Sequence, residues 1–116
     1  MEYLLFLNDS PYGSQRTYNA LRLGGALAKG ATIEVSIFLL GDGVVCGVRM
    51  QSPADASYNV QEMLRLLAAQ GVSIGPCRTC LEARGIDDAS LVTGINRCTL
   101  DDPRTWTEEA TKVLVF

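Results

Sequence analysis

The chain has 116 residues, a net charge of −3 and 47% hydrophobic residues, which suits one folded domain with a full core. Its ten lysine and arginine residues are scattered, which argues against nucleic acid as the main partner. The chain has no apolar run of about 18 residues, so the sequence predicts no membrane-spanning helix. The run Leu4–Leu7 is too short for a signal peptide, so we expect a cytoplasmic protein without membrane contact.

The first forty residues alternate between strand and helix patterns. Tyr3–Leu7 is a nearly continuous apolar run, typical of a strand covered on both faces. The loop Asn8–Gly13 is rich in turn-forming residues, and Ser14–Lys29 has the apolar spacing of a helix. Ile33–Leu40 predicts a second buried strand.

The middle of the chain predicts one clear helix. Val44–Met50 is ambiguous between a short helix and an irregular turn, and a polar loop follows it. Asn59 then begins a helix, with Glu62 as its capping-box partner. Apolar residues recur on one face of this helix, at Val60, Met63, Leu64 and Leu67. Val72–Ile74 predicts the third strand.

The last third predicts two helices, one short helical stretch and two further strands. In chain order these are helix Arg78–Arg84 closed by Gly85, a short helical stretch at Asp88–Val92, strand Gly94–Cys98, helix Asp101–Ala110 with Thr99 as N-cap, and strand Lys112–Phe116. Alternating strands and helices predict an α/β fold with a mainly parallel sheet and helices on both faces.

The pentapeptide Pro76–Cys80 forms a CxxC motif between the third strand and the next helix. Cys77 lies where that helix begins, and exposed amides and the helix dipole there favour a thiolate over a thiol. Cys80 is either a second reactive thiol or a small hydrophobe facing the core. We expect all four cysteines to be reduced, with Cys46 and Cys98 in core or near-surface positions.

Three glycine-containing loops, Asn8–Gly13, Gly41–Val44 and Gly75–Cys77, follow predicted strands. Ligands of parallel sheets collect outside the carboxyl ends of the strands, so these loops would share one rim. Candidate binding residues on this rim are Asn8, Tyr12, Gly13, Asp42 and Arg84. The first loop feeds a helix N-terminus and either helps to bind an anion or is a well-capped turn.

No metal or cofactor is expected from the sequence. A structural zinc site would need histidines or a second close cysteine pair, and the chain has neither. The missing histidines also argue against an acid–base hydrolase. CxxC in a βαβ context is a redox signature, which makes a dithiol redox protein an alternative. That motif usually follows an early strand, with a nearby aromatic residue, whereas here it follows the third strand.

Several segments, in this order, resemble the DsrE/DsrF-like family, including its sulfur-relay, TusD-like members. The segments are Asn8-Asp9-x-Pro11-Tyr12-Gly13, Tyr18–Leu23, Phe38–Val44, Gly71-Val72-x-Ile74-x-x-Cys77-x-x-Cys80, Ala83–Ile86 and Lys112–Phe116. The resemblance implies a three-layer α/β/α domain over residues 1–116, with a five-stranded, mainly parallel sheet. It also implies homo-oligomers, as trimers or hexamers.

The resemblance further implies a function. Relay members hold sulfur as a persulfide on a cysteine after the third strand, which is Cys77 here. They accept it from a donor protein and pass it to an acceptor protein, which makes a sulfurtransferase activity the expectation. Cys80 stands where those members generally have a small apolar residue, which leaves dithiol chemistry open. A non-catalytic binding or assembly subunit is the third reading.

Overall fold

Four parallel strands form the central sheet, in the order β3-β2-β1-β4. The computed structural model describes residues 1–116. The strands are β1 (Glu2–Leu7), β2 (Glu34–Leu39), β3 (Ser73–Pro76) and β4 (Lys112–Val115). The apolar runs of β1 and β2 take the two central places, where both faces of a strand are covered.

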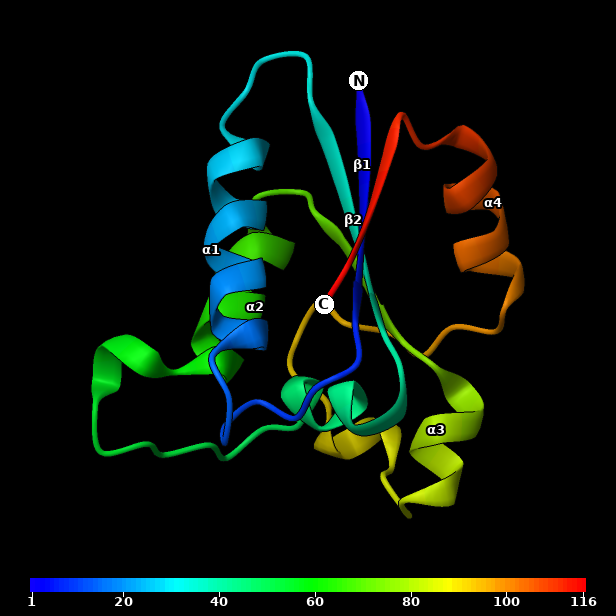
Figure 1. Cartoon of the computed structure of the whole chain (residues 1–116). Helices are drawn as coiled ribbons and strands as arrows, with labels where there is room; N and C mark the ends of the chain where they lie inside the picture. Colours follow the sequence, from blue (N-terminus) through cyan, green and yellow to red (C-terminus); the bar gives the residue numbers. More distant parts are fainter.

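Helices cover both faces of this sheet, as right-handed crossovers between parallel strands require (Figure 1). α1 (Arg16–Ala28) and α2 (Val60–Ala69) pack on one face, and α3 (Arg78–Ala83) and α4 (Asp101–Glu109) lie on the other. The predicted α/β/α layering is therefore confirmed. None of these helices is both long enough and apolar enough to cross a membrane.

Short 3₁₀ turns connect the main elements. The ambiguous stretch Val44–Met50 begins inside the 3₁₀ turn η1 (Gly41–Gly47) and leaves it after Gly47. The turns η2 (Ala56–Tyr58) and η3 (Asp88–Ser90) interrupt later loops. The predicted cap of α2 is present, because the Asn59 side chain accepts a hydrogen bond from the Glu62 amide at 3.0 Å. The reciprocal half of a capping box is replaced by an ion pair between Glu62 and Arg65.

The predicted strand Gly94–Cys98 is wrong, and the sheet has four strands rather than five. This segment meets β3 only in an isolated parallel bridge between Cys77 and Cys98. The Cys98 amide donates to the Pro76 carbonyl, and the Arg78 amide donates to the Cys98 carbonyl, each at 2.8 Å. The next ladder bond would need an N–H at Pro76, which proline lacks, so the ladder stops there.

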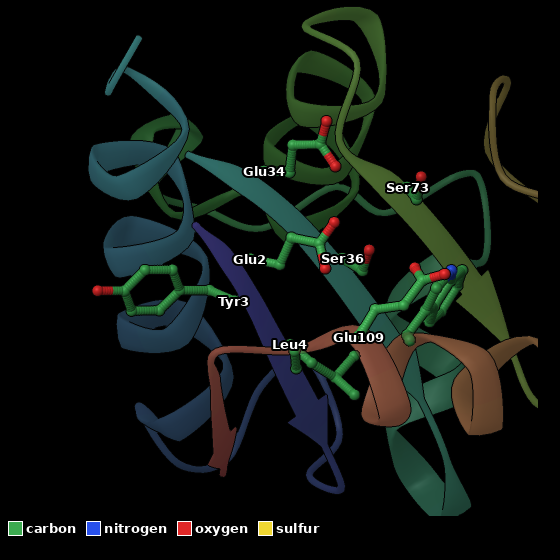
Figure 2. A pocket seen from close by; sticks show the side chains of 9 residues that line it. Glu2, Tyr3, Leu4, Glu34, Ser36, Ser73 and Glu109 are labelled. Atoms are coloured by element: carbon green, nitrogen blue, oxygen red, sulfur yellow. The ribbon is translucent and has the colours of Figure 1, made fainter. Parts of the chain in front are cut away.

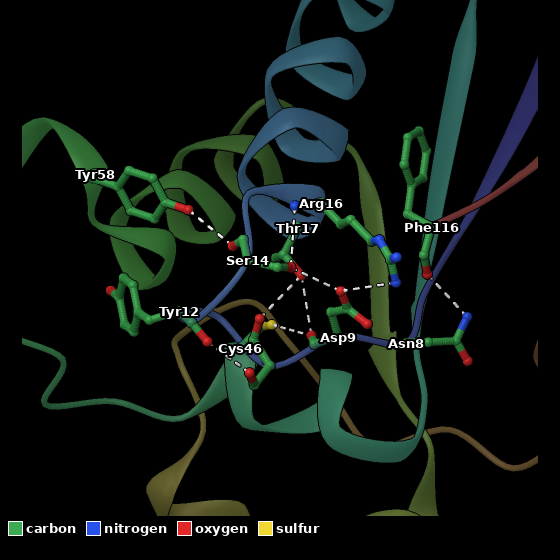
Figure 3. Close-up of polar contacts among 10 residues, drawn as sticks. Asn8, Asp9, Tyr12, Ser14, Arg16, Thr17, Cys46, Tyr58 and Phe116 are labelled. Carbon is green, nitrogen blue, oxygen red and sulfur yellow. Dashed lines mark hydrogen bonds and ion pairs between the residues drawn. The ribbon is translucent and has the colours of Figure 1, made fainter.

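The loop after β1 is fixed by buried hydrogen bonds (Figure 3). The Thr17 hydroxyl, on a side chain that is 1% exposed, donates to the carbonyls of Asp9 and Ser10. The Cys46 thiol of η1 donates to the same Asp9 carbonyl at 3.4 Å. These contacts bind the loop to α1 and to η1, so the first loop is held in one conformation at the carboxyl end of the sheet.

Candidate functional site

Cys77 lies where β3 ends and α3 begins. It has extended backbone angles and occupies the N-cap position of α3, as the sequence predicts. The whole residue is only 7% exposed, but its side chain is on the wall of an open pocket of about 500 Å³. Arg78, Thr79 and Glu82 form the α3 side of this pocket, and residues 98–101 form the opposite side. The sulfur can therefore be reached by a small group that enters the pocket.

The surroundings of Cys77 favour its thiolate. Burial raises the pKa of the Cys77 thiol, but hydrogen bonds from the Thr79 hydroxyl and from the amides and thiol that follow lower this pKa by more, so it lies below the ordinary value. The Thr79 oxygen is 3.2 Å from the sulfur. The amides of Thr79 and Cys80 contribute without forming a cap hydrogen bond of standard geometry. Neither Arg78 nor Arg84 is among the groups that lower the pKa.

Cys80 is half-buried and does not line the pocket. Its sulfur accepts a hydrogen bond from the Gly41 amide at 3.2 Å, which ties α3 to the end of β2. The Cys80 side chain also helps to lower the pKa of the Cys77 thiol. Cys80 thus packs beside the core, as one of the two expectations from the sequence has it, and its side chain also lowers the pKa of Cys77.

Cys98 is a second thiol on the wall of the pocket, opposite Cys77 in the parallel bridge. Burial, the Asp102 carboxylate and the charge of Cys77 raise the pKa of the Cys98 thiol to about 11. Its sulfur lies directly over Gly75 of β3, at a place where the Cβ of any other residue would be 1.8 Å from it. The glycine therefore makes room for this thiol.

The predicted rim residues divide into two groups. Asp42 and Arg84 come together as an ion pair at 2.9 Å, and Arg84 also donates to the Cys80 carbonyl, so both lie beside the CxxC helix. Asn8 binds the Phe116 carbonyl at the end of β4 instead (Figure 3).

The other two rim residues, Tyr12 and Gly13, belong to the loop on the α1 and α2 side. The Tyr12 hydroxyl donates to the Gln51 side chain at 2.8 Å and accepts from the Val60 amide. The nearby Tyr58 hydroxyl donates to the Ser14 carbonyl (Figure 3). The loop that holds Tyr12 is thereby attached to the segment before α2, and neither Tyr12 nor Gly13 lines the Cys77 pocket.

A second pocket lies at the opposite, amino-terminal ends of the strands (Figure 2). It measures about 140 Å³, and three carboxylates, Glu2, Glu34 and Glu109, surround it. No cysteine lines it, and its Ser36 and Ser73 hydroxyls have no histidine that could act as a base, since the chain contains none. Elsewhere, too, no three histidine, cysteine or acidic side chains gather in a way that could hold a metal ion. The Cys77 pocket is consequently the candidate site, at the end of the sheet where parallel folds place chemistry.

Thr79 and Cys98 are the site residues that sequence reasoning missed. A hydroxyl two residues after Cys77, inside the CxxC motif, was a usable signal for Thr79. Cys98 had no such signal, because 21 positions separate it from Cys77 and only the bridge between the two segments brings them together.

Comparison with known proteins agrees with this fold. The sequence profile of the DsrE/DsrF-like family matches residues 1–116. The chain belongs to the DsrE/DsrF-like family. Protein YchN of Escherichia coli (strain K12) is 40% identical over 114 residues, which are 97% of each chain. The crystal structure of YchN from E. coli superimposes with a TM-score of 0.90, at 38% identity and with full coverage of both chains.

More distant members of this DsrE/DsrF-like family carry a functional name. The "Sulfurtransferase TusD homolog" of Vibrio vulnificus (strain CMCP6) is 31% identical over 87 residues, which are 74% of this chain and 66% of that protein. The predicted relationship to sulfur-relay proteins is therefore confirmed at the level of the family.

Proposed function

We propose that this protein is a sulfur carrier that holds sulfane sulfur as a persulfide on Cys77 and passes it to a partner protein. One observation carries the proposal: a cysteine with a lowered pKa lies on the wall of an open pocket. A thiolate is the nucleophilic form of cysteine. A sulfur carrier uses this form twice, as the attacking group when it takes up sulfur and as the leaving group when it hands sulfur on. Family membership, with sulfurtransferases among the relatives, supports the same assignment.

Loading and unloading are two displacements at sulfur. In loading, the Cys77 thiolate attacks the terminal sulfur of a donor persulfide. The new S–S bond forms as the donor's S–S bond breaks, and the donor leaves as a thiolate. In unloading, an acceptor thiolate attacks the terminal sulfur held on Cys77, and Cys77 leaves as a thiolate. A low pKa suits the second step because weakly basic thiols are good leaving groups.

Intact mass spectrometry tests this assignment. After incubation with a polysulfide donor, the wild-type chain should gain ~32 Da for each sulfur bound. Cys77→Ser should gain nothing, whereas Cys46→Ser, in which a buried thiol is replaced, should load as the wild type does. Loading that persists at the wild-type level in Cys77→Ser would show that the carrier cysteine lies elsewhere.

A dithiol redox function is the second candidate, because Cys80 lies three residues after Cys77 at the start of the same helix and its side chain lowers the pKa of Cys77. In that case Cys77 and Cys80 would form a disulfide with a defined reduction potential. Equilibration with mixtures of reduced and oxidised glutathione, followed by alkylation and mass analysis, distinguishes the two functions. A 77–80 disulfide that forms at physiological ratios would favour the redox function.

We also propose that the protein assembles into trimers or hexamers, with a partner sulfur donor and a partner acceptor. Support comes from the edge strand β4, where Val113 is 42% exposed and Val115 is 70% exposed. An edge strand with exposed apolar residues is a surface that oligomers commonly cover. Light scattering coupled to size-exclusion chromatography measures the mass, and a strictly monomeric chain would contradict this assembly.

A further inference from the structure

We propose that Cys98 is a resolving thiol, which attacks a Cys77 persulfide within the same chain, releases hydrosulfide and leaves a Cys77–Cys98 disulfide. This inference rests on the proposed function, because it concerns the fate of sulfur already bound to Cys77. It goes beyond the CxxC motif, since it assigns the internal reaction to a cysteine that lies outside it.

The bridge places the two thiols on the same side of the sheet. Cys77 and Cys98 are directly opposite each other in a parallel pair, so their side chains project from one face. Neighbouring strands lie about 4.8 Å apart. This spacing is inside the window of about 4.4–6.8 Å between Cα atoms that a disulfide accepts. Both side chains also line the same pocket.

The glycine beneath Cys98 gives this thiol its place in the site. In its present rotamer the Cys98 sulfur rests over Gly75, with the Asn96 carbonyl 3.7 Å away as a weak acceptor. Reaching Cys77 requires a change of χ1 at Cys98, from one staggered rotamer to another. The pocket of about 500 Å³ leaves room for that rotation and for the departing sulfur.

Cys80 is less suited to this step in the structure. Its sulfur accepts a hydrogen bond from the Gly41 amide and lies away from the pocket, where a leaving hydrosulfide would have to depart. The Cys80 side chain lowers the pKa of Cys77 and so supports the thiolate instead. Cys80 therefore acts as a positioning residue in this scheme, and Cys98 as the reacting one.

The step balances without an added oxidant. The Cys98 thiol gives its proton to the departing sulfur, and its sulfur attacks the inner sulfur of the Cys77 persulfide. The bond between the inner and the terminal sulfur breaks, and the terminal sulfur leaves as hydrosulfide with the electron pair. The persulfide is the oxidant, and a cellular dithiol would be needed to reduce the resulting disulfide before the next cycle.

The attack of Cys98 on the persulfide is slow at neutral pH because its thiol is protonated there. Burial, Asp102 on α4 and the Cys77 sulfur keep the pKa of Cys98 at about 11, and the other charged side chains that line the same pocket are Arg78, Glu82 and Asp101. Arg97, the adjacent residue, is paired with Asp88 and Glu82 instead. Cys98 thus stays a neutral thiol while an external acceptor thiol competes for the terminal sulfur on Cys77. Cys98 attacks the persulfide only when no acceptor thiol binds.

The test follows the sulfur after loading. The full chain is loaded with polysulfide, freed of excess donor, and incubated at pH 8 without any acceptor thiol or air. Intact mass first scores whether Cys77 is loaded, which tests the proposed function alone. Released hydrosulfide and the peptide map of the disulfide are then measured in wild type, Cys98→Ser and the matched control Cys46→Ser, whose buried thiol does not line the pocket.

We expect wild type and Cys46→Ser to release hydrosulfide as a 77–98 disulfide forms. Cys98→Ser should load equally but release at least about tenfold more slowly. A persulfide that stays intact in wild type, a 77–80 disulfide, or unchanged release in Cys98→Ser would overturn the role of Cys98 and leave the carrier function standing. A chain that never loads on Cys77 would overturn both.

A second measurement does not depend on loading or on the stability of the variants. Diamide oxidises a pair of nearby thiols directly to a disulfide. Peptide mapping of the oxidised wild-type chain should find Cys77 joined to Cys98. Thermal melts followed by circular dichroism show whether Cys98→Ser is folded, and Cys98→Ala serves as the second variant if it is not. Oxidation that joins Cys77 only to Cys80 would contradict the proposed pairing.

Discussion

Replacing Thr79 by valine removes the hydroxyl that lies 3.2 Å from the Cys77 sulfur, while the size of the side chain is kept. A hydrogen bond to a charged group contributes about 1.5–3 kcal/mol, and the lower end applies here because Thr79 is solvent-exposed. One pKa unit corresponds to about 1.4 kcal/mol. We therefore expect the pKa of Cys77 in Thr79→Val to rise by about one unit.

The effect on reactivity has two opposing parts. Below the pKa, one unit lowers the thiolate fraction about tenfold, but a more basic thiolate is about threefold more nucleophilic. Alkylation of Cys77 should thus be about threefold slower in Thr79→Val at acidic pH and about threefold faster at alkaline pH, so the two profiles cross. The assay is the pH dependence of the iodoacetamide rate at Cys77, followed by peptide mass.

Thr79→Ser is the matched control, because it keeps the hydroxyl and should keep the wild-type midpoint. If Thr79→Val titrates with the wild-type midpoint as well, the hydroxyl does not stabilise the thiolate. The low pKa of Cys77 would then depend on the backbone amides and on Cys80 alone.

Three further predictions concern the packing that supports the site. Gly75→Ala should destabilise the fold because its Cβ would be 1.8 Å from the Cys98 sulfur, and the same change should cost much less in a Cys98→Ala background. Thr17→Val should lower the free energy of unfolding in urea by about 1–3 kcal/mol because the half-buried Ser10 carbonyl loses the Thr17 donor and the Asp9 carbonyl keeps only the Cys46 thiol, whereas exposed Thr93→Val should change it little. Leu64→Ala, at a fully buried position of α2, should cost about 2–5 kcal/mol in the same assay. Equal costs of Gly75→Ala in both backgrounds, an unchanged Thr17→Val or a harmless Leu64→Ala would each contradict the packing described.

Local patterns in the sequence were enough to predict most of the fold. Apolar runs such as Tyr3–Leu7 indicate buried parallel strands, and the order of strands and helices indicates layers on both faces. The cap at Asn59 was readable because capping depends on residues only a few positions apart. The strand Gly94–Cys98 was predicted wrongly because its pairing depends on a distant proline, Pro76, which cannot donate the bond that a ladder needs.

The site was predictable only in part. The position of Cys77 at a helix start follows from the local CxxC pattern, and the structure places it there. Its solvent exposure, the neighbouring Cys98 thiol and the ion pair of Asp42 with Arg84 depend on contacts between segments far apart in the chain. Proximity in sequence to Arg84 gave no guide to the charge of Cys77, because the guanidinium group is engaged with Asp42.

The segment that carries Cys98 is attached to β3 by two backbone hydrogen bonds, whereas β1 and β2 pair over six residues each. A segment held by so few hydrogen bonds can separate from β3 while the rest of the sheet stays intact. The free energy of this local opening is a small fraction of the free energy of unfolding the domain. Each local opening would move one wall of the pocket outward and let a larger molecule reach the Cys77 sulfur. A disulfide between Cys77 and Cys98 would hold this wall in place. The oxidation state of the two cysteines would therefore also set how large a molecule the pocket admits.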